Sequence, residues 1–186
     1  MSMVVGGLAL HPSGAFGTFI AGTSDNQTVA SGTVAIAVGS IDRVTVGKAG
    51  MRPGDSVYRA VDIVNQPTLT QGGLGITTGA NPSSVLDTDT TNGLQLAVDV
   101  CSTAWTESGS APNYTYTCPG TQQVSIAQRP IIFSSIQLLH SLLTVGATNH
   151  YRLTVTLPTT SPSSAQAQSS TIKVYYGSQG RAGTEQ

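Results

Sequence analysis

Short runs in which apolar and polar residues alternate recur along most of this chain, and they limit its fold more than any other feature. In the clearest run, residues 150–157, every second side chain is apolar and Pro158 follows directly. Side chains of a strand alternate between its two faces, so this run predicts a strand that is buried on one side. Similar runs lie at residues 33–38, 56–65, 94–100 and 171–176.

The strand predicted at residues 56–65 follows a turn that the sequence also defines. Pro53 presets φ at the first central position of a turn, and Gly54 accepts the positive φ that a type II turn needs next. We expect the strand to start at Ser56 and to end at Asn65. Its apolar face carries Val57, Val61 and Ile63, and Arg59 interrupts that row.

Weaker strand patterns at residues 16–21, 41–46, 73–77 and 124–127 are separated by clusters of turn-forming residues. Many short strands with turns between them favour an all-β sandwich, and the long connections favour a jelly roll. One short helix is expected at residues 134–143, where Ile136, Leu139 and Leu143 have helical spacing and a serine precedes them. The uniform composition predicts one jelly-roll domain at residues 15–178 and a polar tail at residues 179–186.

The low charge of the chain excludes some classes of partner. Charged residues make up only 9% of the sequence and the formal net charge is −1. Nucleic-acid binding needs clustered Lys and Arg, which are absent here, so no nucleic-acid partner is expected. No apolar run approaches the length of about 18 residues that a membrane span needs, and no cofactor motif is present.

Two cysteines, Cys101 and Cys118, bracket a polar segment in a chain that has no others. An even pair of this kind suggests a disulfide and therefore an oxidising, extracellular setting, and two buried free thiols are the alternative. Asn26 and Asn113 each begin a match to the N-glycosylation sequon, which is typical of surface loops in secreted proteins.

The N-terminal segment, residues 1–14, is apolar and uncharged over its first ten residues. It resembles part of a signal peptide without the basic region, or a hydrophobic strand that needs a partner. We expect the strand. Its apolar side chains are Met3, Val4, Val5, Leu8 and Leu10, and Gly6 and Gly7 between them allow close backbone approach.

Catalytic and metal-binding motifs are weak. The three histidines, His11, His140 and His150, lack recognised metal-ligand spacing, and no HExxH or nucleophile-elbow motif occurs. Asp87 and Asp89 lack the ordered set of acidic ligands that a calcium loop supplies. We therefore expect no metal site and no enzymatic activity.

Several segments match a known family in order and spacing. They are Gly17-Thr18-Phe19 with Thr23-Ser24-Asp25, Ala30-Ser31-Gly32-Thr33-Val34, Arg52-Pro53-Gly54-Asp55-Ser56-Val57 continuing to Asn65, Gly93-Leu94-Gln95-Leu96-Ala97-Val98, Cys101 with Ala104-Trp105 and Cys118, and Tyr151-Arg152-Leu153-Thr154-Val155-Thr156-Leu157-Pro158. Together they resemble the TasA/camelysin family of secreted matrix proteins of Gram-positive bacteria, above all its smaller actinobacterial members, which are related in kind to archaeal bundling pili. The chain departs from the family pattern at residues 17–25, GTFIAGTSD, and at Gln66-Pro67.

The resemblance implies a jelly-roll subunit of an extracellular filament, in which the N-terminal strand of one subunit completes a sheet of the next. The partner is then the chain itself, with other matrix components or surface glycans as further partners. One alternative is a monomeric surface adhesin or carbohydrate-binding jelly roll that uses Trp105, Tyr114 and Tyr116 as stacking faces. For the single Trp of a chain with 5% aromatic residues, we favour the reading in which Trp105 fills the core beside the disulfide. A metallopeptidase, an activity attributed to some relatives of this family, is the least favoured alternative.

Overall fold

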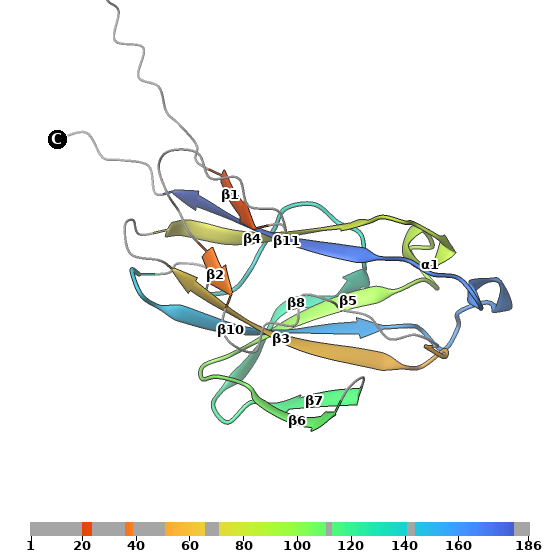
Figure 1. The fold of residues 1–186 in the computed structure, drawn as a ribbon, viewed down its shortest axis with the longest axis horizontal. Coiled ribbons are helices and arrows are strands. Elements are labelled where there is room, and N and C mark those ends of the chain that lie inside the picture. The colour runs from red at the N-terminus through yellow and green to blue at the C-terminus, as the bar shows by residue number, and fades with distance from the viewer. Residues whose placement is uncertain are drawn as a thin grey trace, which may run out of the picture.

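The computed structural model describes residues 20–23, 36–38, 51–65, 71–110, 113–140 and 144–180. Two antiparallel sheets lie face to face, with a separate two-stranded hairpin beneath the larger one (Figure 1). The four-stranded sheet has the order β1 (Ile20–Thr23), β11 (Ile172–Gly180), β4 (Gln71–Ala80) and β9 (Ile136–Gln137). The five-stranded sheet has the order β2 (Ile36–Val38), β3 (Ser56–Asn65), β10 (Thr148–Thr156), β5 (Gln95–Cys101) and β8 (Gln122–Pro130), and the hairpin consists of β6 (Thr106–Ser110) and β7 (Asn113–Thr117).

The predicted fold class, an all-β sandwich with one short helix, is confirmed. Strands β3, β5, β10 and β11 lie where the strong alternating runs predict them, and β2 lies within the run at residues 33–38. Strands β4 and β8 extend two of the weaker runs, and β1 overlaps the run at residues 16–21 only at Ile20 and Ala21. The run at residues 41–46 falls outside the described residues. The jelly-roll order of the connections stays a prediction.

The turn before β3 has the predicted geometry. Gly54 has φ +94°, and the amide of Asp55 donates to the carbonyl oxygen of Arg52 at 2.9 Å. The amide of Gly54 also donates to Leu157 O at 2.7 Å, so the turn is fixed to the end of β10. Strand β3 then runs from Ser56 to Asn65, as expected, and pairs with β10 over nine residues without a register shift.

The hydrophobic core fills the space between the two sheets, as in other sandwiches. Tyr151 and Leu153 of the central strand β10 are 0% and 1% exposed, and each fully buried aliphatic side chain of such a core contributes about 1.5–3 kcal/mol. The Tyr151 hydroxyl donates to Leu139 O at 2.7 Å, and burial raises the pKa of this phenol. Around these two residues pack Val61, Ile63, Leu74, Ile76, Leu94, Leu96, Val98, Val100, Ile126, Ile131, Leu138, Val155, Leu157 and Tyr176.

The helix predicted at residues 134–143 is wrong for all the residues that are described there. Ile136 and Gln137 form β9, which pairs with Gly75 and Ile76 of β4. Left-handed backbone at Ser135 (φ 39°) and His140 (φ 55°) is incompatible with a continuous helix. Sheet hydrogen bonding outweighs helical spacing in this segment.

The short helix lies elsewhere, at α1 (Val85–Thr88). Ser84 caps its start by accepting a hydrogen bond from the Leu86 amide, and the Asp87 carboxylate accepts one from the amide of Ser84. This reciprocal arrangement is a capping box, formed here with an aspartate instead of the usual glutamate. A turn of 3-10 helix, η1 (Ser163–Ala165), lies beside α1 at the same end of the sandwich (Figure 1).

The segment at residues 131–138 crosses from one sheet to the other. The amide of Ile131 donates to Leu94 O beside the five-stranded sheet, and the amide of Leu138 donates to Leu74 O in the four-stranded sheet. Between them, Thr78 Oγ1 of β4 accepts a hydrogen bond from the Phe133 amide at 3.0 Å. One continuous segment therefore hydrogen-bonds to both layers.

The C-terminal strand extends further than predicted. Gln179 and Gly180, which the sequence places in the polar tail, belong to β11, and Gln179 pairs with Gly73 and with Ile20. The rest of the predicted tail and the whole segment at residues 1–14 lie outside the described residues.

Candidate functional site

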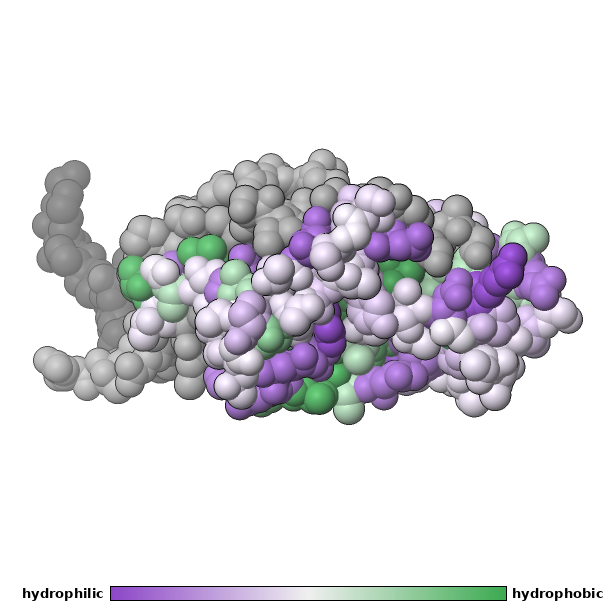
Figure 2. All heavy atoms as spheres, turned by 90° about the horizontal axis from the view of Figure 1, so that it is seen from below, coloured by the Kyte–Doolittle hydropathy of each residue, from purple (hydrophilic) through white to green (hydrophobic). Residues whose placement is uncertain are grey.

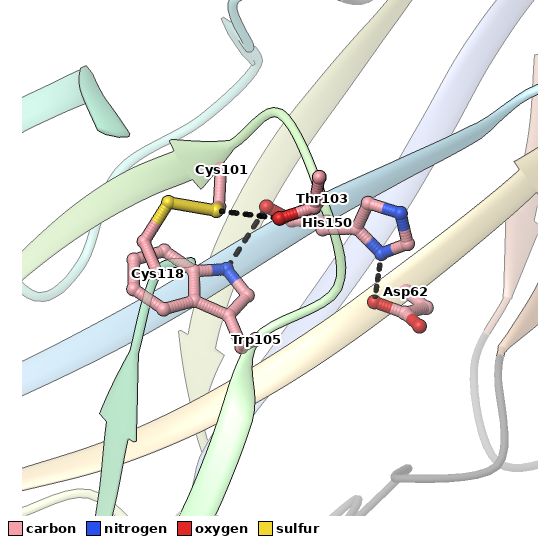
Figure 3. A network of polar contacts seen from close by, with 6 residues as sticks. All are labelled: Asp62, Cys101, Thr103, Trp105, Cys118 and His150. Atoms are coloured by element: carbon pink, nitrogen blue, oxygen red, sulfur yellow. Dashed lines mark hydrogen bonds and ion pairs between the residues drawn. A yellow bond between two sulfur atoms is a disulfide. The ribbon is translucent and has the colours of Figure 1, made fainter. Parts of the chain in front are cut away.

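The predicted disulfide is present and fixes the β6–β7 hairpin to the sandwich. Cys101 at the end of β5 is bonded to Cys118, which directly follows β7 (Figure 3). The sequence does not predict the hairpin, because β6 carries no apolar residue and β7 carries only Tyr114 and Tyr116. The disulfide holds it against β3, where Ala60 packs with Tyr116.

Trp105 fills the space between this hairpin and the larger sheet. It is 3% exposed, and its Nε1 donates to the backbone carbonyl oxygen of His150 at 3.0 Å (Figure 3). Tyr116 is buried in the same cluster and Tyr114 is half-buried against it. Of the two readings of Trp105, core packing beside the disulfide is confirmed, so its ring offers no exposed face on which a sugar could stack.

A buried ion pair lies under the hairpin. Arg152 Nη2 donates to Asp99 Oδ2 at 2.6 Å, and the two side chains are 18% and 12% exposed. The guanidinium also lies over the rings of Trp105 and Tyr58, at 4.6 and 5.6 Å from their centres. These contacts compensate the desolvation of a charge that apolar surroundings would otherwise disfavour.

Arg59, which interrupts the apolar row of β3, is also accommodated by contacts with neighbours. It is 5% exposed, its Nη1 donates to Tyr58 O at 2.6 Å, and its guanidinium lies 5.5 Å from the centre of the Tyr114 ring. The hairpin therefore covers two cationic side chains, both of them in contact with aromatic rings.

Tyr116 joins the two strands of the hairpin through its hydroxyl group. The hydroxyl donates to Glu107 Oε2 at 2.7 Å. Burial of the phenol, together with this carboxylate, raises its pKa to about 12. The group is therefore a neutral hydrogen-bond donor at physiological pH.

The histidines do not form a metal site in the described part of the chain. His150 Nδ1 lies 2.7 Å from Asp62 Oδ1, a pair that joins β10 to β3 on the outer face of the sheet (Figure 3). His140 Nε2 lies 2.9 Å from Gln123 Oε1. No group of three or more His, Cys, Asp or Glu residues gathers among the described residues, and His11 is not among them.

Asp87 and Asp89, the two aspartates that a calcium loop would use, both accept hydrogen bonds from neighbouring residues. The carboxylate of Asp87 accepts hydrogen bonds from Ser83, Ser84 and Ser170. Burial alone would raise the pKa of Asp87, but these hydrogen bonds outweigh burial, so its pKa lies below the ordinary value. Asp89 Oδ1 accepts from the amides of Thr91 and Asn92, which lowers the pKa of that exposed carboxyl. Both carboxylates therefore stabilise the α1 corner.

Within the described residues, the two sheets differ in the regularity of pairing at their edges. Strand β8 is at the edge of the five-stranded sheet, and its register with β5 shifts twice, between Leu96 and Val98 and between Val98 and Asp99. Bulges of this kind hinder the addition of a further strand. In the four-stranded sheet, β1 pairs with β11 only at residues 176–179, and β11 keeps a regular register with β4 from Ile172 to Gln179.

The remaining predicted site residues are the two sequon asparagines and the apolar residues of the N-terminal segment. Asn113 is exposed at the start of β7, close to the hairpin turn, whereas Asn26 lies outside the described residues. The apolar side chains proposed for strand donation also lie outside them. Figure 2 shows the hairpin side of the molecule as pale and purple over most of the described surface, with green residues in small, separate patches. No large apolar patch is visible on the described part of this face.

No helix in the described part of the chain is long and apolar enough to cross a membrane. Comparison with models of known protein families and with curated protein sequences finds no match to this chain.

Proposed function

We propose that this chain is a secreted structural subunit of an extracellular filament, which grows head to tail by strand donation. In this proposal the apolar segment at residues 1–14 of one subunit pairs with a sheet edge of the next. The chain acts through assembly and carries out no catalysis. Its main partner is another copy of itself.

The partly covered edge of β11 is the observation that carries this proposal. Within the described residues, β1 pairs with only the C-terminal half of β11, and residues 172–175 have a strand neighbour on the β4 side alone. Such an edge presents backbone N–H and C=O groups that a strand from another chain can satisfy. The bulged edge of β8 is less suited to this role.

The composition of the N-terminal segment supports the same proposal. Met3, Val4, Val5, Leu8 and Leu10 are apolar, and no charge separates them. At about 25 cal/mol per Å2 of buried apolar surface, several such side chains contribute several kcal/mol per junction before ordering costs. A head-to-tail contact of this kind does not close on itself, so it produces filaments.

The disulfide supports an oxidising location. Cys101–Cys118 is formed, and such bonds persist outside the cytosol. An extracellular matrix is an oxidising location of this kind.

Negative-stain electron microscopy of the purified protein tests the proposal. We expect fibres from the full chain and monomers from a variant that lacks residues 1–11. Leu8→Asp should prevent assembly because it places a charge among the donated side chains, and Ser2→Asp adds the same charge beside them as the matched control. A full chain that stays monomeric would contradict the filament, whereas fibres from the deletion variant would contradict strand donation alone.

A further inference from the structure

A small pocket with polar walls lies beside the disulfide, at the end of β5. It encloses about 250 Å3, just below the ~300 Å3 at which pockets for drug-sized ligands begin. Buried Val100 and Cys101 contribute to its lining, and they are the apolar part of it. A pocket of this size accommodates one ring-sized molecule and not an extended chain.

The other lining residues carry neutral hydrogen-bonding groups. They are three hydroxyl residues, two amide residues and one imidazole: Ser102, Thr121, Thr148, Gln123, Asn149 and His140. Among the described residues that line the pocket there is no Asp, Glu, Lys or Arg, so this part of the lining presents no formal charge to a phosphate, a carboxylate or an ammonium group. Hydroxyl and amide side chains can both donate and accept hydrogen bonds, as a ligand with several hydroxyl groups requires.

The pocket wall is held in position by contacts outside it. Asn149 Nδ2 donates to His140 O and to the Tyr151 hydroxyl, and this leaves Asn149 Oδ1 as an acceptor. The amide of Leu139 donates to Ser125 Oγ at 2.9 Å. These bonds keep His140 in its left-handed conformation with φ 55°, in which its Nε2 lies 2.9 Å from Gln123 Oε1 in the pocket wall. A wall that is ordered in this way loses little entropy on binding.

We propose that this pocket binds a neutral, polyhydroxylated ring, that is, a single sugar residue at the end of a glycan. Val100 and Cys101 contact its C–H groups, and the side chains of Gln123, His140 and Asn149 bond its hydroxyls. The site does not use the rings of Trp105, Tyr114 or Tyr116. It is separate from the proposed acceptor edge, because none of its described lining residues lies on β11.

Titration of the full chain with methyl glycosides tests this site. The probes are the methyl glycosides of glucose, galactose, mannose and N-acetylglucosamine, added to 15N-labelled protein while amide chemical shifts are recorded. At least one should shift the amides of Ser102, Gln123 and Asn149, with a dissociation constant on the order of 1 mM for so small a ligand. Absence of any shift at these amides would overturn the proposal.

Substitutions assign the binding to the pocket. Gln123→Ala should weaken binding about 5- to 10-fold because one or two hydrogen bonds are lost. Gln128→Ala removes the same side chain from another exposed position of β8 and should leave binding unchanged. His140→Asn keeps a residue that tolerates left-handed backbone and should also weaken binding.

Two outcomes contradict the choice of ligand. If Gln128→Ala weakens binding as much as Gln123→Ala, the effect is not local to the pocket. If an acetylated amino-acid methylamide, added as a comparison probe, shifts the same amides at lower concentration than every glycoside, the pocket recognises peptide groups instead of sugars.

Discussion

The guanidinium of Arg152 lies 4.6 Å from the centre of the Trp105 ring while its Nη2 bonds Asp99 at 2.6 Å. One cation thus joins the central strand of the larger sheet to the neighbouring strand and to the base of the hairpin. We expect Arg152→Met to destabilise the protein by about 3 kcal/mol, because it leaves the largely buried carboxylate of Asp99 without its partner. Urea unfolding measures this change.

The double variant Arg152→Met/Asp99→Asn is the control for that prediction. It removes both charges, so the cost of an unpaired buried carboxylate disappears and part of the stability should return. A double variant that is less stable than Arg152→Met would show that the ion pair is not the cause.

Removal of the disulfide should destabilise the fold by about 3 kcal/mol. Cys101 and Cys118 are 17 positions apart, and opening a loop of this size increases the conformational freedom of the unfolded chain by that amount. The unfolding free energy of Cys101→Ala/Cys118→Ala, measured in urea, tests this. Dithiothreitol should destabilise the wild type and leave the double variant unchanged; an equal effect on both would contradict the prediction.

Thr78→Val should destabilise the protein by about 1–3 kcal/mol. Thr78 is 5% exposed, and its Oγ1 donates to Ile131 O and accepts from the Phe133 amide. Valine preserves the shape but leaves both of these backbone groups without that partner. Thr117→Val, at an exposed position of β7, is the matched control and should change stability by less than about 0.5 kcal/mol. Differential scanning calorimetry measures both.

The α1 corner should make stability depend on pH. Hydrogen bonds from Ser83, Ser84 and Ser170 lower the pKa of Asp87 below its ordinary value of 3.8 against the opposing effect of burial. A lowered pKa in the folded state means that the carboxylate stabilises the fold above about pH 4, and that this contribution disappears as the pH falls through the folded-state pKa.

Asp87→Asn isolates this contribution. The variant should be less stable than the wild type at pH 7, and the difference should shrink as the pH falls below about 4. Chemical denaturation at a series of pH values measures it. A difference that stays constant down to pH 3 would contradict the assignment.

The sequence was most informative where local pattern and tertiary environment agree. Ser56–Asn65 alternates along its length and follows a Pro-Gly turn, and the predicted start and end of this strand are those of β3. The two cysteines were likewise predicted to pair. In both cases the determining residues are close together in the sequence, so few alternatives compete.

The sequence misled at residues 134–143 because Ile136 and Leu139 suit a helix by spacing alone. Leu138, which breaks that pattern, is buried, and Leu139 is 44% exposed, so the segment alternates in the manner of a strand. The strand partners of Ile136 and Gln137 lie on β4, more than 50 positions earlier in the chain. Local propensity could not identify them.

The polar site residues could not be predicted for a related reason. Asp62 and His150 are 88 positions apart, and Arg152 and Asp99 are 53 apart. Neither pair forms a motif, and each is brought together only by the pairing of β10 with β3 and β5. The pocket beside Cys101 depends on the same pairing and on the unexpected conformation of His140.

The segment at residues 131–138 affects how the molecule responds to force. When a two-layer sandwich is stretched, one layer can slide over the other if only side-chain packing joins them. Here sliding must detach this segment from one of the layers, either at the bond of Ile131 to Leu94 or at the bonds of Phe133 to Thr78 and Leu138 to Leu74. The crossing segment therefore opposes displacement of one layer relative to the other.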